Sequence, residues 1–320
     1  MNVLSSPRTA SASDDVSSIS PASKPWIEQA AMAFGVGVPF LGLIAAIVLA
    51  WGKIVGWTDI WLMLAFYSFS ILGVTIGFHR MFTHRALQAG PVLRFVTGVA
   101  GSMSGQGPVL EWCAIHRQHH KHSDRDGDPH SPHVHCGSVG GIFRGMLHAH
   151  FGWLFSHDEI TKPAVVADLL ADPVLHFVDR FFWLWMLLGW IVPGIIGGLI
   201  SHSWMGALTG FLWGGLVRTF LLHHVTWSIN SVCHVWGRRP FNTPDHSRNN
   251  LLFGLLAFGE GWHNNHHAFP TSARHGLRWW QFDITYIVIR ALELTGLAWK
   301  VRLPAASAIE SRSQAQSSPA

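Results

Sequence analysis

The stretch IWLMLAFYSFSILGVTIGFHRMFTH, residues 60–84, joins an apolar segment directly to two histidines. Residues 60–78 carry no charge over 19 positions, and a helix of that length can cross a hydrocarbon core of about 30 Å. His79 and His84 follow where such a helix leaves the apolar layer. The stretch therefore predicts a transmembrane helix that presents imidazoles at its end.

Three further stretches have the same apolar character. Residues 31–51 carry no charge over 21 positions and are separated from 60–78 by a tight turn, which predicts a helical hairpin. Residues 181–200 and 204–227 predict a second pair, with Arg218 near the far end of its span, where its side chain can reach the interface. We therefore predict an all-α integral membrane protein with four transmembrane helices.

The overall composition agrees with a membrane protein and excludes several other classes. Hydrophobic residues make up 49% of the 320 positions and charged residues only 12%, which excludes a disordered chain. The 22 Lys and Arg residues are scattered singly, so the net charge of +4 does not indicate nucleic-acid binding. Histidine is the anomaly, with 22 residues, and the function is to be sought there.

The distribution of Lys and Arg predicts the orientation in the membrane. Nineteen of the 22 lie in the N-terminal segment, in 79–178 or after position 227. Both termini and the active site are therefore expected on the cytosolic side. The predicted parts are a disordered cytosolic tail (1–28), a membrane domain (29–302) with a cytosolic helical cap (79–178 and 228–302), and a second disordered tail (303–320).

Nine histidines concentrate in four short motifs, HRMFTH, HRQHH, WSINSVCH and HNNHH. In an HxxHH motif the histidines fall within about 100° of one another around a helix, so that three rings share one face. Such a face is suited to binding a metal. The candidate ligands are His79, His84, His116, His119, His120, His234, His263, His266 and His267.

The spacing inside two of the motifs raises separate points. His79 and His84 are five residues apart, about 140° around an ideal helix. Either the helix loosens after the membrane or the two rings serve different metals. Asn230 precedes His234 by four residues and can share its face, which makes Asn230 a candidate direct or water-mediated contributor.

The number and type of ligands bear on the metal. Imidazole serves Zn, Cu, Fe and Ni alike, but a zinc site needs only three or four ligands. Nine histidines can hold two metals and leave positions open for oxygen, which predicts two redox irons. A metal site above four apolar helices also predicts a substrate with a polar head and a long apolar tail, such as an acyl chain.

The remaining histidines have weaker claims to a role. Candidates for contacts behind the ligands or to a substrate head group are His122, His130, His133, His135, His148, His150, His223 and His224. Expected to be solvated or locally hydrogen-bonded are His157, His176, His202, His246 and His275. Glu260, beside the last motif, can either orient a histidine ring or form a surface ion pair.

The motifs and their flanks resemble the membrane-bound fatty acyl desaturases of the stearoyl-CoA desaturase type. The resemblance covers residues 67–299 and rests on LGVTIGFHRMFTH, EWCAIHRQHHKHSD with DGDPH, HFGWLF, TWSINSVCHVWGRRPFN and EGWHNNHHAFP. It implies two irons bound by the nine histidines, with Asn230 contributing through water. It also implies that O2 and two electrons are used to insert a cis double bond, usually between carbons 9 and 10 of a long saturated acyl chain.

The resemblance further assigns substrate and partner sites. It implies that Gln106, Trp112 and Thr226 bend the acyl chain beside the irons, and that Tyr67 and Ile71 lie near the closed end of the acyl tunnel. No fused cytochrome domain follows the last motif, so electrons are expected from a separate ferredoxin-, rubredoxin- or cytochrome-like protein with its reductase. The acyl carrier, CoA or a membrane lipid, is left open.

Two other functions compete with this one. A histidine-rich hydroxylase or oxidase of alkanes, fatty acids, sterols or carotenoids shares the metal chemistry, and the product, a hydroxyl or a double bond, separates it from a desaturase. A membrane metal transporter needs ionisable ligands near the middle of the membrane. The first three spans carry no charged residue and the histidines cluster at one face, which disfavours transport.

Overall fold

The computed structural model describes residues 26–51, 55–133, 139–155 and 163–317, and nearly all regular structure in them is helical. Four helical rods in these residues are long and apolar enough to cross a membrane, which confirms the predicted number. They are α1 (Trp26–Trp51), α2 (Trp57–Leu72) with η1 (Gly73–Thr83), α8 (Phe182–Ser201), and α9 (Trp204–Gly210) continued by η4 (Phe211–Val217), α10 (Arg218–Ser231) and η5 (Val232–His234). The fourth rod runs past the predicted 204–227 because its helix continues as far as a histidine motif.

The second rod widens from an α-helix to a π-helix where it reaches the histidines. In a π-helix each N–H pairs with the carbonyl five residues earlier. The N–H of His84 donates such a bond to the carbonyl oxygen of His79 at 3.1 Å. The widening brings the two rings together, with centroids 4.8 Å apart. Of the two possibilities that the sequence leaves open, the loosened helix is therefore the one realised.

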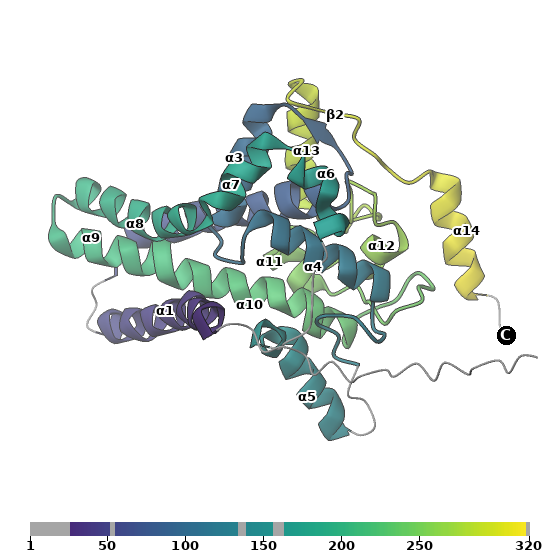
Figure 1. The fold of residues 1–320 in the computed structure, drawn as a ribbon, viewed down its shortest axis with the longest axis horizontal. Helices are drawn as coiled ribbons and strands as arrows, with labels where there is room; N and C mark the ends of the chain where they lie inside the picture. Colours follow the sequence, from purple (N-terminus) through teal and green to yellow (C-terminus); the bar gives the residue numbers. More distant parts are fainter. Residues whose placement is uncertain (1–25, 52–54, 134–138, 156–162, 318–320) are drawn as a thin grey trace, which may run out of the picture.

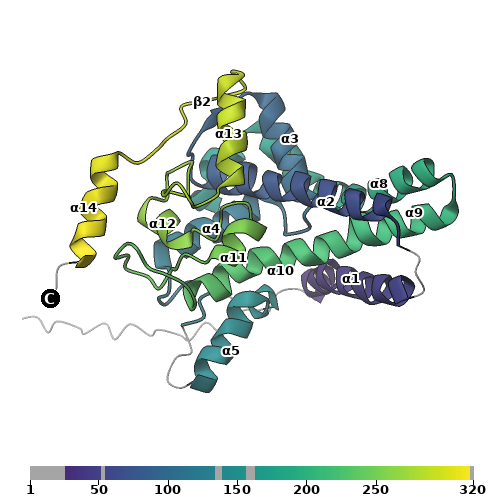
Figure 2. The same cartoon turned by 180° about the vertical axis from the view of Figure 1, so that it is seen from behind.

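The third and fourth rods lie side by side in both ribbon views (Figures 1 and 2). Small residues permit this close approach, because a Cβ atom at Gly210 would lie 2.6 Å from the carbonyl oxygen of Pro193. Gly206 and Gly210 are four residues apart on the same face of the rod, a spacing typical of tightly packed membrane helices. α1 runs along α10 and the preceding π-helix, η4 (Figure 1).

The residues outside the rods form a cap at one end of the bundle. Its elements are α3 (Pro91–Ser102), α4 (Val109–His122), α5 (Val139–His150), η2 (Gly152–Phe155), η3 (Pro163–Val166), α6 (Ala167–Leu170), α7 (Pro173–Arg180), α11 (Leu251–Leu256), α12 (His263–Ala268) and α13 (Ile284–Leu294). A two-residue antiparallel ribbon joins β1 (Gln88–Ala89) to β2 (Ala298–Trp299). The cap core contains Phe78 of η1 together with Cys113, Leu175 and Ile289. The end of the second rod is thus fixed inside the cap.

The C-terminal segment differs from the prediction of a disordered tail over 303–320. Helix α14 covers Ala306–Ser317, and Figure 2 shows it beyond the irregular connection that follows β2. Ala, Glu, Gln and Arg are good helix formers, which favours a helix in this segment. The Arg312 guanidinium donates to the carbonyl oxygen of Ala268 and lies 4.6 Å from the Phe269 ring, which ties the helix to the cap. The predicted N-terminal tail lies, up to residue 25, outside the described residues.

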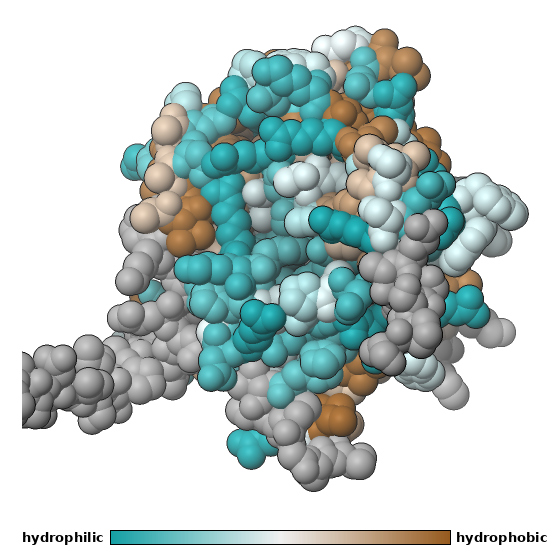
Figure 3. Space-filling view, turned by 90° about the vertical axis from the view of Figure 1, so that its right-hand side faces the viewer, coloured by the Kyte–Doolittle hydropathy of each residue, from teal (hydrophilic) through white to brown (hydrophobic). Residues whose placement is uncertain are grey.

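The surface is divided between an apolar part over the rods and a polar end. Large apolar side chains are exposed along the rods, among them Phe40 and Val48 of α1, Trp61 of α2 and Leu199 of α8. Figure 3 looks onto the end of the molecule where α12 and α14 lie, and that face is mostly hydrophilic. This division is typical of a membrane protein whose cap faces water.

Candidate metal centre

The nine histidines of the four motifs converge inside the cap in two groups. The first group consists of His79, His84, His116, His120 and His266, and the second of His119, His234, His263 and His267. Within each group one nitrogen from every ring lies within 4.8 Å of all the others. The second rod, α4, α12 and the end of the fourth rod supply the rings. Residues from distant parts of the chain therefore build two adjacent clusters of imidazoles.

Each HxxHH motif divides its rings between the two groups. His116 and His120 of α4 belong to the first group, whereas His119 belongs to the second. On α12 the division is reversed, because the outer two histidines of HNNHH join the second group and the middle one, His266, joins the first. The helix face that the sequence predicts as one metal-binding surface thus forms the boundary between two clusters.

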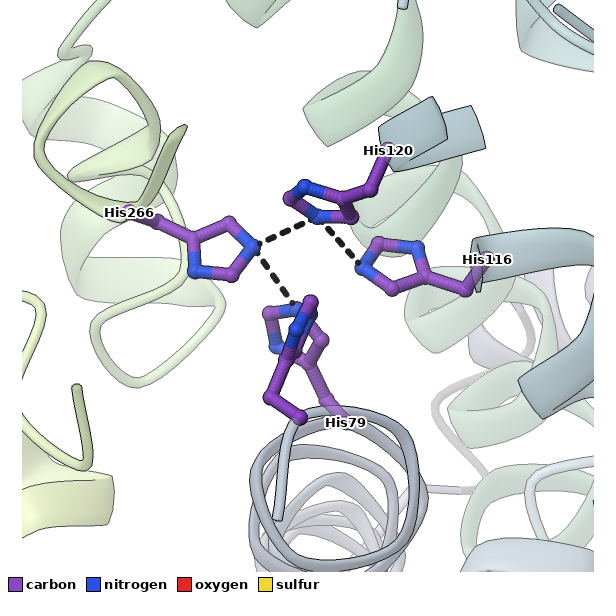
Figure 4. A group of neighbouring side chains, drawn as sticks. His79, His116, His120 and His266 are labelled. Atoms are coloured by element: carbon purple, nitrogen blue, oxygen red, sulfur yellow. Dashed lines mark hydrogen bonds between the residues drawn. The ribbon is translucent and has the colours of Figure 1, made fainter. Parts of the chain in front are cut away.

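The ring nitrogens of the first group are spaced as a bound metal requires. Figure 4 shows the rings of His79, His116, His120 and His266 pointing toward one another. The Nε2 atoms lie 2.9 Å apart for His120 and His266, 3.1 Å for His79 and His266, and 3.2 Å for His116 and His120. Two nitrogens bound to one metal at right angles and about 2.1 Å would lie about 3.0 Å apart. The buried Nε2 of His84 has no hydrogen-bond partner among the described residues.

The second group repeats this arrangement with four rings. The Nε2 atom of His263 lies 3.0 Å from that of His234 and 3.1 Å from that of His267. The Nε2 atom of His119 is buried and, within the described part of the chain, has no hydrogen-bond partner. Nitrogen lone pairs that face one another in a buried site repel unless a cation lies between them. Both groups therefore fit a bound metal ion.

Four of the nine rings are held from behind by carboxylates. Nδ1 contacts a carboxylate oxygen in the pairs His79 with Glu260 (2.6 Å), His119 with Asp128 (2.9 Å), His234 with Asp124 (2.8 Å) and His267 with Asp245 (2.8 Å). A carboxylate that accepts the Nδ1 proton fixes the orientation of the ring and leaves Nε2 free for a metal. Of the two roles considered for Glu260, orienting a histidine is therefore the one that the structure shows.

The histidine motifs and their spacing do not point to the three aspartates in this set. Asp124 and Asp128 belong to the turn-rich DRDGDPH segment after α4, and aspartate in a turn ordinarily caps backbone N–H groups. Asp245 lies in a loop far from its partner in the chain. Burial alone would raise the pKa values of these carboxyls, but their histidine partners outweigh it and lower all three pKa values. For Asp124 and Asp128, their position directly after the HRQHH motif was the available signal.

The surroundings of the groups keep most of their rings neutral. The pKa values of His84, His116, His120, His263 and His266 lie well below the ordinary range. Burial is the main cause, and the neighbouring imidazoles add to it. A neutral imidazole has the free lone pair that a metal ligand needs.

Arg80 supports the first group through a buried ion network. Its guanidinium donates to Glu260 at 2.9 Å and to Asp283 at 3.1 Å, and its side chain is fully buried. Asp283 also accepts the N–H of Tyr286 at 2.9 Å, in the first turn of α13. The network therefore connects the carboxylate behind His79 to a helix of the cap.

A cavity of about 330 Å³ connects this centre with the rods. Its walls come mainly from α1, α4, α10 and the loop 105–108, with further residues from α8, and they include apolar side chains such as Met32 and Met186. His79, His116 and His263 also line it, so the cavity reaches rings of both groups. The lining further includes Asn230 and Ile71. This arrangement suits an apolar chain that passes beside the two histidine groups.

The three residues expected to bend an acyl chain lie together in the wall of this cavity. The Gln106 side chain donates to the Thr226 hydroxyl at 3.0 Å and accepts the Trp112 indole N–H at 3.3 Å. Trp112 also stacks on His116, with ring centroids 5.1 Å apart. The polar cluster is therefore directly connected to a ring of the first group.

The two residues expected at the closed end of the tunnel differ in position. Ile71 lines the cavity and is 1% exposed. Tyr67 is not among the lining residues of the described chain: its hydroxyl donates to the carbonyl oxygen of Leu256 at 2.8 Å and its ring packs edge-on against Phe258. Only Ile71 can thus contact a chain in the cavity as it stands.

The other histidines differ in their burial and contacts. His176, His202 and His246 are exposed, as expected, but His275 is fully buried, with Nδ1 3.3 Å from Glu260. The His275 ring packs against that of His266 in the first group, with centroids 4.5 Å apart, and this contact places it inside the cap. The His130 ring packs at a tilt against that of His119, with centroids 4.5 Å apart, and burial lowers the pKa of His130 to about 3.

Among the remaining candidates, His133 contacts the carbonyl oxygen of His234 at 2.8 Å, and His150 pairs with His224 at 2.9 Å. His122 and His148 are half-buried. His135 and His157 lie outside the described residues.

Comparison with known proteins identifies the relatives of this architecture. The family model "Fatty acid desaturase" matches residues 55–301. The hex-5-enoyl-[acyl-carrier protein] acetylenase of Moorena producens is 42% identical over 86% of this chain and 86% of its own length. The sn-1 stearoyl-lipid 9-desaturase of Anabaena variabilis is 38% identical over 72% of this chain and 79% of its own length. The acyl-CoA C20 Delta5-desaturase of Anemone leveillei is 37% identical over 78% and 75%, respectively.

Proposed function

The chain belongs to the fatty acid desaturase family, and we propose that it inserts a cis double bond at carbon 9 of a long saturated acyl chain. The observation that carries the proposal is the apolar cavity that passes a polar bend and reaches rings of both histidine groups. An unactivated methylene group cannot be deprotonated by ordinary acid–base side chains, so the reaction needs a metal-based oxidant. The cavity provides a place for the acyl chain, and the two histidine groups provide the ligands for the metal-based oxidant.

In this proposal each histidine group holds one iron. The first iron has His79, His84, His116, His120 and His266 as ligands, and the second has His119, His234, His263 and His267, with Asn230 contributing through a water molecule. The bound irons supply the activation of O2 that removal of two hydrogens demands. The carboxylates behind four of the rings support the assignment, because they direct Nε2 toward the metal position.

The protein's own part in the reaction is to position the chain and exclude water. Each buried methylene contributes about 0.8 kcal/mol, so an apolar cavity binds a long chain without directional contacts. The carbon that meets the irons must then be selected by the shape of the cavity. Gln106, Trp112 and Thr226 set the bend beside His116, and Ile71 limits the length of chain beyond it.

Carrier, donor and orientation complete the proposal. The names of the relatives include an acyl-carrier-protein, a lipid and a CoA substrate, so they do not choose among carriers, and we propose acyl-CoA or acyl-lipid. Electrons come from a separate ferredoxin-, rubredoxin- or cytochrome-like protein and its reductase. The excess of Lys and Arg outside the rods supports a cytosolic location for the cap and both termini.

Expression in a host that lacks its own desaturase, followed by mass spectrometry of the fatty acids, tests the function. We expect palmitate or stearate to lose two hydrogens between carbons 9 and 10. A hydroxylated product would favour the oxidase alternative. Conversion of an existing double bond into a triple bond, as the name of the acetylenase relative suggests, would also contradict the proposal. A variant with His120→Ala serves as the inactive control.

A further inference from the structure

The loop 103–107, between α3 and α4, forms part of the cavity wall and contains Gln106 of the bend. Its backbone is irregular, with φ of +71° at Gly105 and +102° at Gly107, so no regular helix or strand holds it in place. The loop is instead held by side chains of α10, whose face toward the loop includes Arg218, His223 and Thr226.

Arg218 holds the first residue of the loop. Its guanidinium is fully buried and donates to the carbonyl oxygen of Met103 at 2.8 Å. The same guanidinium donates to the carbonyl oxygens of Gly189 at 2.7 Å and Gly214 at 3.1 Å. Arg218 therefore fixes the loop to both the third and the fourth rods, and the role predicted for it, reaching the membrane interface, is not the one it has.

His223 holds the next two residues. Its Nε2 atom lies 2.9 Å from the carbonyl oxygen of Ser104 and 3.1 Å from that of Gly105. Both partners are acceptors, so Nε2 carries a hydrogen that the two carbonyls share. The contact is close, because a Cβ atom at Gly105 would lie 3.3 Å from Nε2. The ring is 2% exposed and itself lines the cavity.

Thr226, three residues after His223, then accepts the hydrogen bond from Gln106. Three side chains of one helix thus hold four consecutive residues, 103–106, and Gln106 in turn holds Trp112 beside His116. The position of the bend relative to the two histidine groups depends on this series of contacts. Its central member, His223, belongs to none of the histidine motifs.

We propose that His223 is a positioning residue that selects which carbon of the acyl chain faces the two histidine groups. The inference rests on the proposed function and deepens it. Without the Nε2–H donor, two buried carbonyl groups lose their partner, and the loop must move to satisfy them. Gln106 would move with it, and a small displacement of the bend changes the register of a chain that is otherwise held only by apolar contacts.

The test compares the positional isomers made by four proteins in the desaturase-deficient host. His223→Leu removes the donor, His223→Gln keeps an N–H in reach of the loop, and His224→Leu is the matched control, because His224 pairs with His150 instead. We expect one double-bond position from the wild type, His223→Gln and His224→Leu. For His223→Leu we expect the share of neighbouring isomers to rise roughly tenfold, with the metal content unchanged.

Several outcomes would overturn the inference. A single, unchanged double-bond position from His223→Leu would contradict it while leaving the proposed function intact. Loss of metal in parallel with loss of product would show a structural role only. If His223→Leu does not accumulate, Gly105→Ala decides, because its Cβ pushes the loop away from an intact His223; an unchanged isomer pattern there overturns the inference as well. A wild type without unsaturated product would defeat the proposed function and this inference together.

Discussion

Nδ1 of His79 lies 2.6 Å from a carboxylate oxygen of Glu260, although the two residues are far apart in the sequence. Both side chains are buried, and Arg80 holds the other carboxylate oxygen at 2.9 Å. The ring of His79 is therefore fixed before any metal arrives. This relationship makes the first histidine group sensitive to a residue that is not itself a proposed ligand.

Glu260→Gln should weaken metal binding in the first group. The amide keeps the volume of the side chain but loses the charge that orients His79 and neutralises Arg80. Loss of such a supporting carboxylate typically lowers metal affinity about 10- to 100-fold. The measurement is iron retained per chain after dialysis against a graded series of chelator concentrations. Glu310→Gln, at an exposed position, is the control, and equal retention by both variants would contradict the proposed role.

Trp112→Ala should alter the product more than the metal content. Trp112 both donates to Gln106 and stacks on His116, so its loss releases the bend next to the first group. We expect a lower rate and several double-bond positions, with iron retained. Trp112→Phe keeps the ring but not the N–H, and should give an intermediate result. Parallel loss of iron and activity in Trp112→Ala would instead indicate a packing role.

Ile71→Ala should shift chain-length preference toward longer substrates. Ile71 lines the cavity, and forcing additional methylenes against a packed side chain costs typically about 1–3 kcal/mol. The assay is competition between sixteen- and eighteen-carbon substrates, with the double-bond position recorded. The sequence predicts the same shift for Tyr67→Gly, which also removes the ring that packs against Phe258. Tyr67→Phe, which loses only the hydrogen bond to Leu256, should keep the wild-type ratio. An unchanged ratio for Ile71→Ala would exclude Ile71 as the end of the tunnel.

The ion pair between Asp168 and Arg117 should contribute a pH-dependent stability. Burial alone would raise the pKa of Asp168, but hydrogen bonds from Arg117 and Arg85 outweigh it and lower that pKa to about 2. Because the folded pKa lies below the unfolded value of about 3.9, the contribution is complete above pH 4 or so and is lost as the pH falls toward 2.

Asp168→Asn should therefore lower the midpoint of thermal unfolding by about 1–3 °C at neutral pH, since the pair is partly exposed. The difference from wild type should be constant down to about pH 4 and shrink below it. Asp126→Asn, at an exposed position, is the control. A difference that grows as the pH falls would contradict the sign of the effect.

The sequence predicted those features that depend on neighbouring residues in the chain. Uncharged runs specify the rods, and the HxxHH spacing on α4 and α12 brings rings onto one helix face. The division of each motif between two groups was not predictable, because it depends on how α4 and α12 face each other. The π-helix at His79 and His84 was equally hidden, since widening a helix changes its hydrogen bonds and not its composition.

The residues that support the centre were the least visible. Asp124 and Asp128 look like turn residues in the sequence, and only folding places their carboxylates against His234 and His119. In the sequence, His223 is one of several histidines without a specific role. Its proposed role depends on contacts with backbone carbonyl oxygens, which no sequence pattern marks. Resemblance to a family supplied the bend residues, which spacing alone could not have indicated.

The number of metal ions per purified chain is the sharpest test of the proposal that the two histidine groups hold two irons. Two histidine groups that each fit a metal predict close to two irons per chain in the wild type, and a reduced iron content with no activity in His234→Ala, whose four apolar rods should still fold. One zinc per chain, with activity unchanged in that variant, would contradict the account.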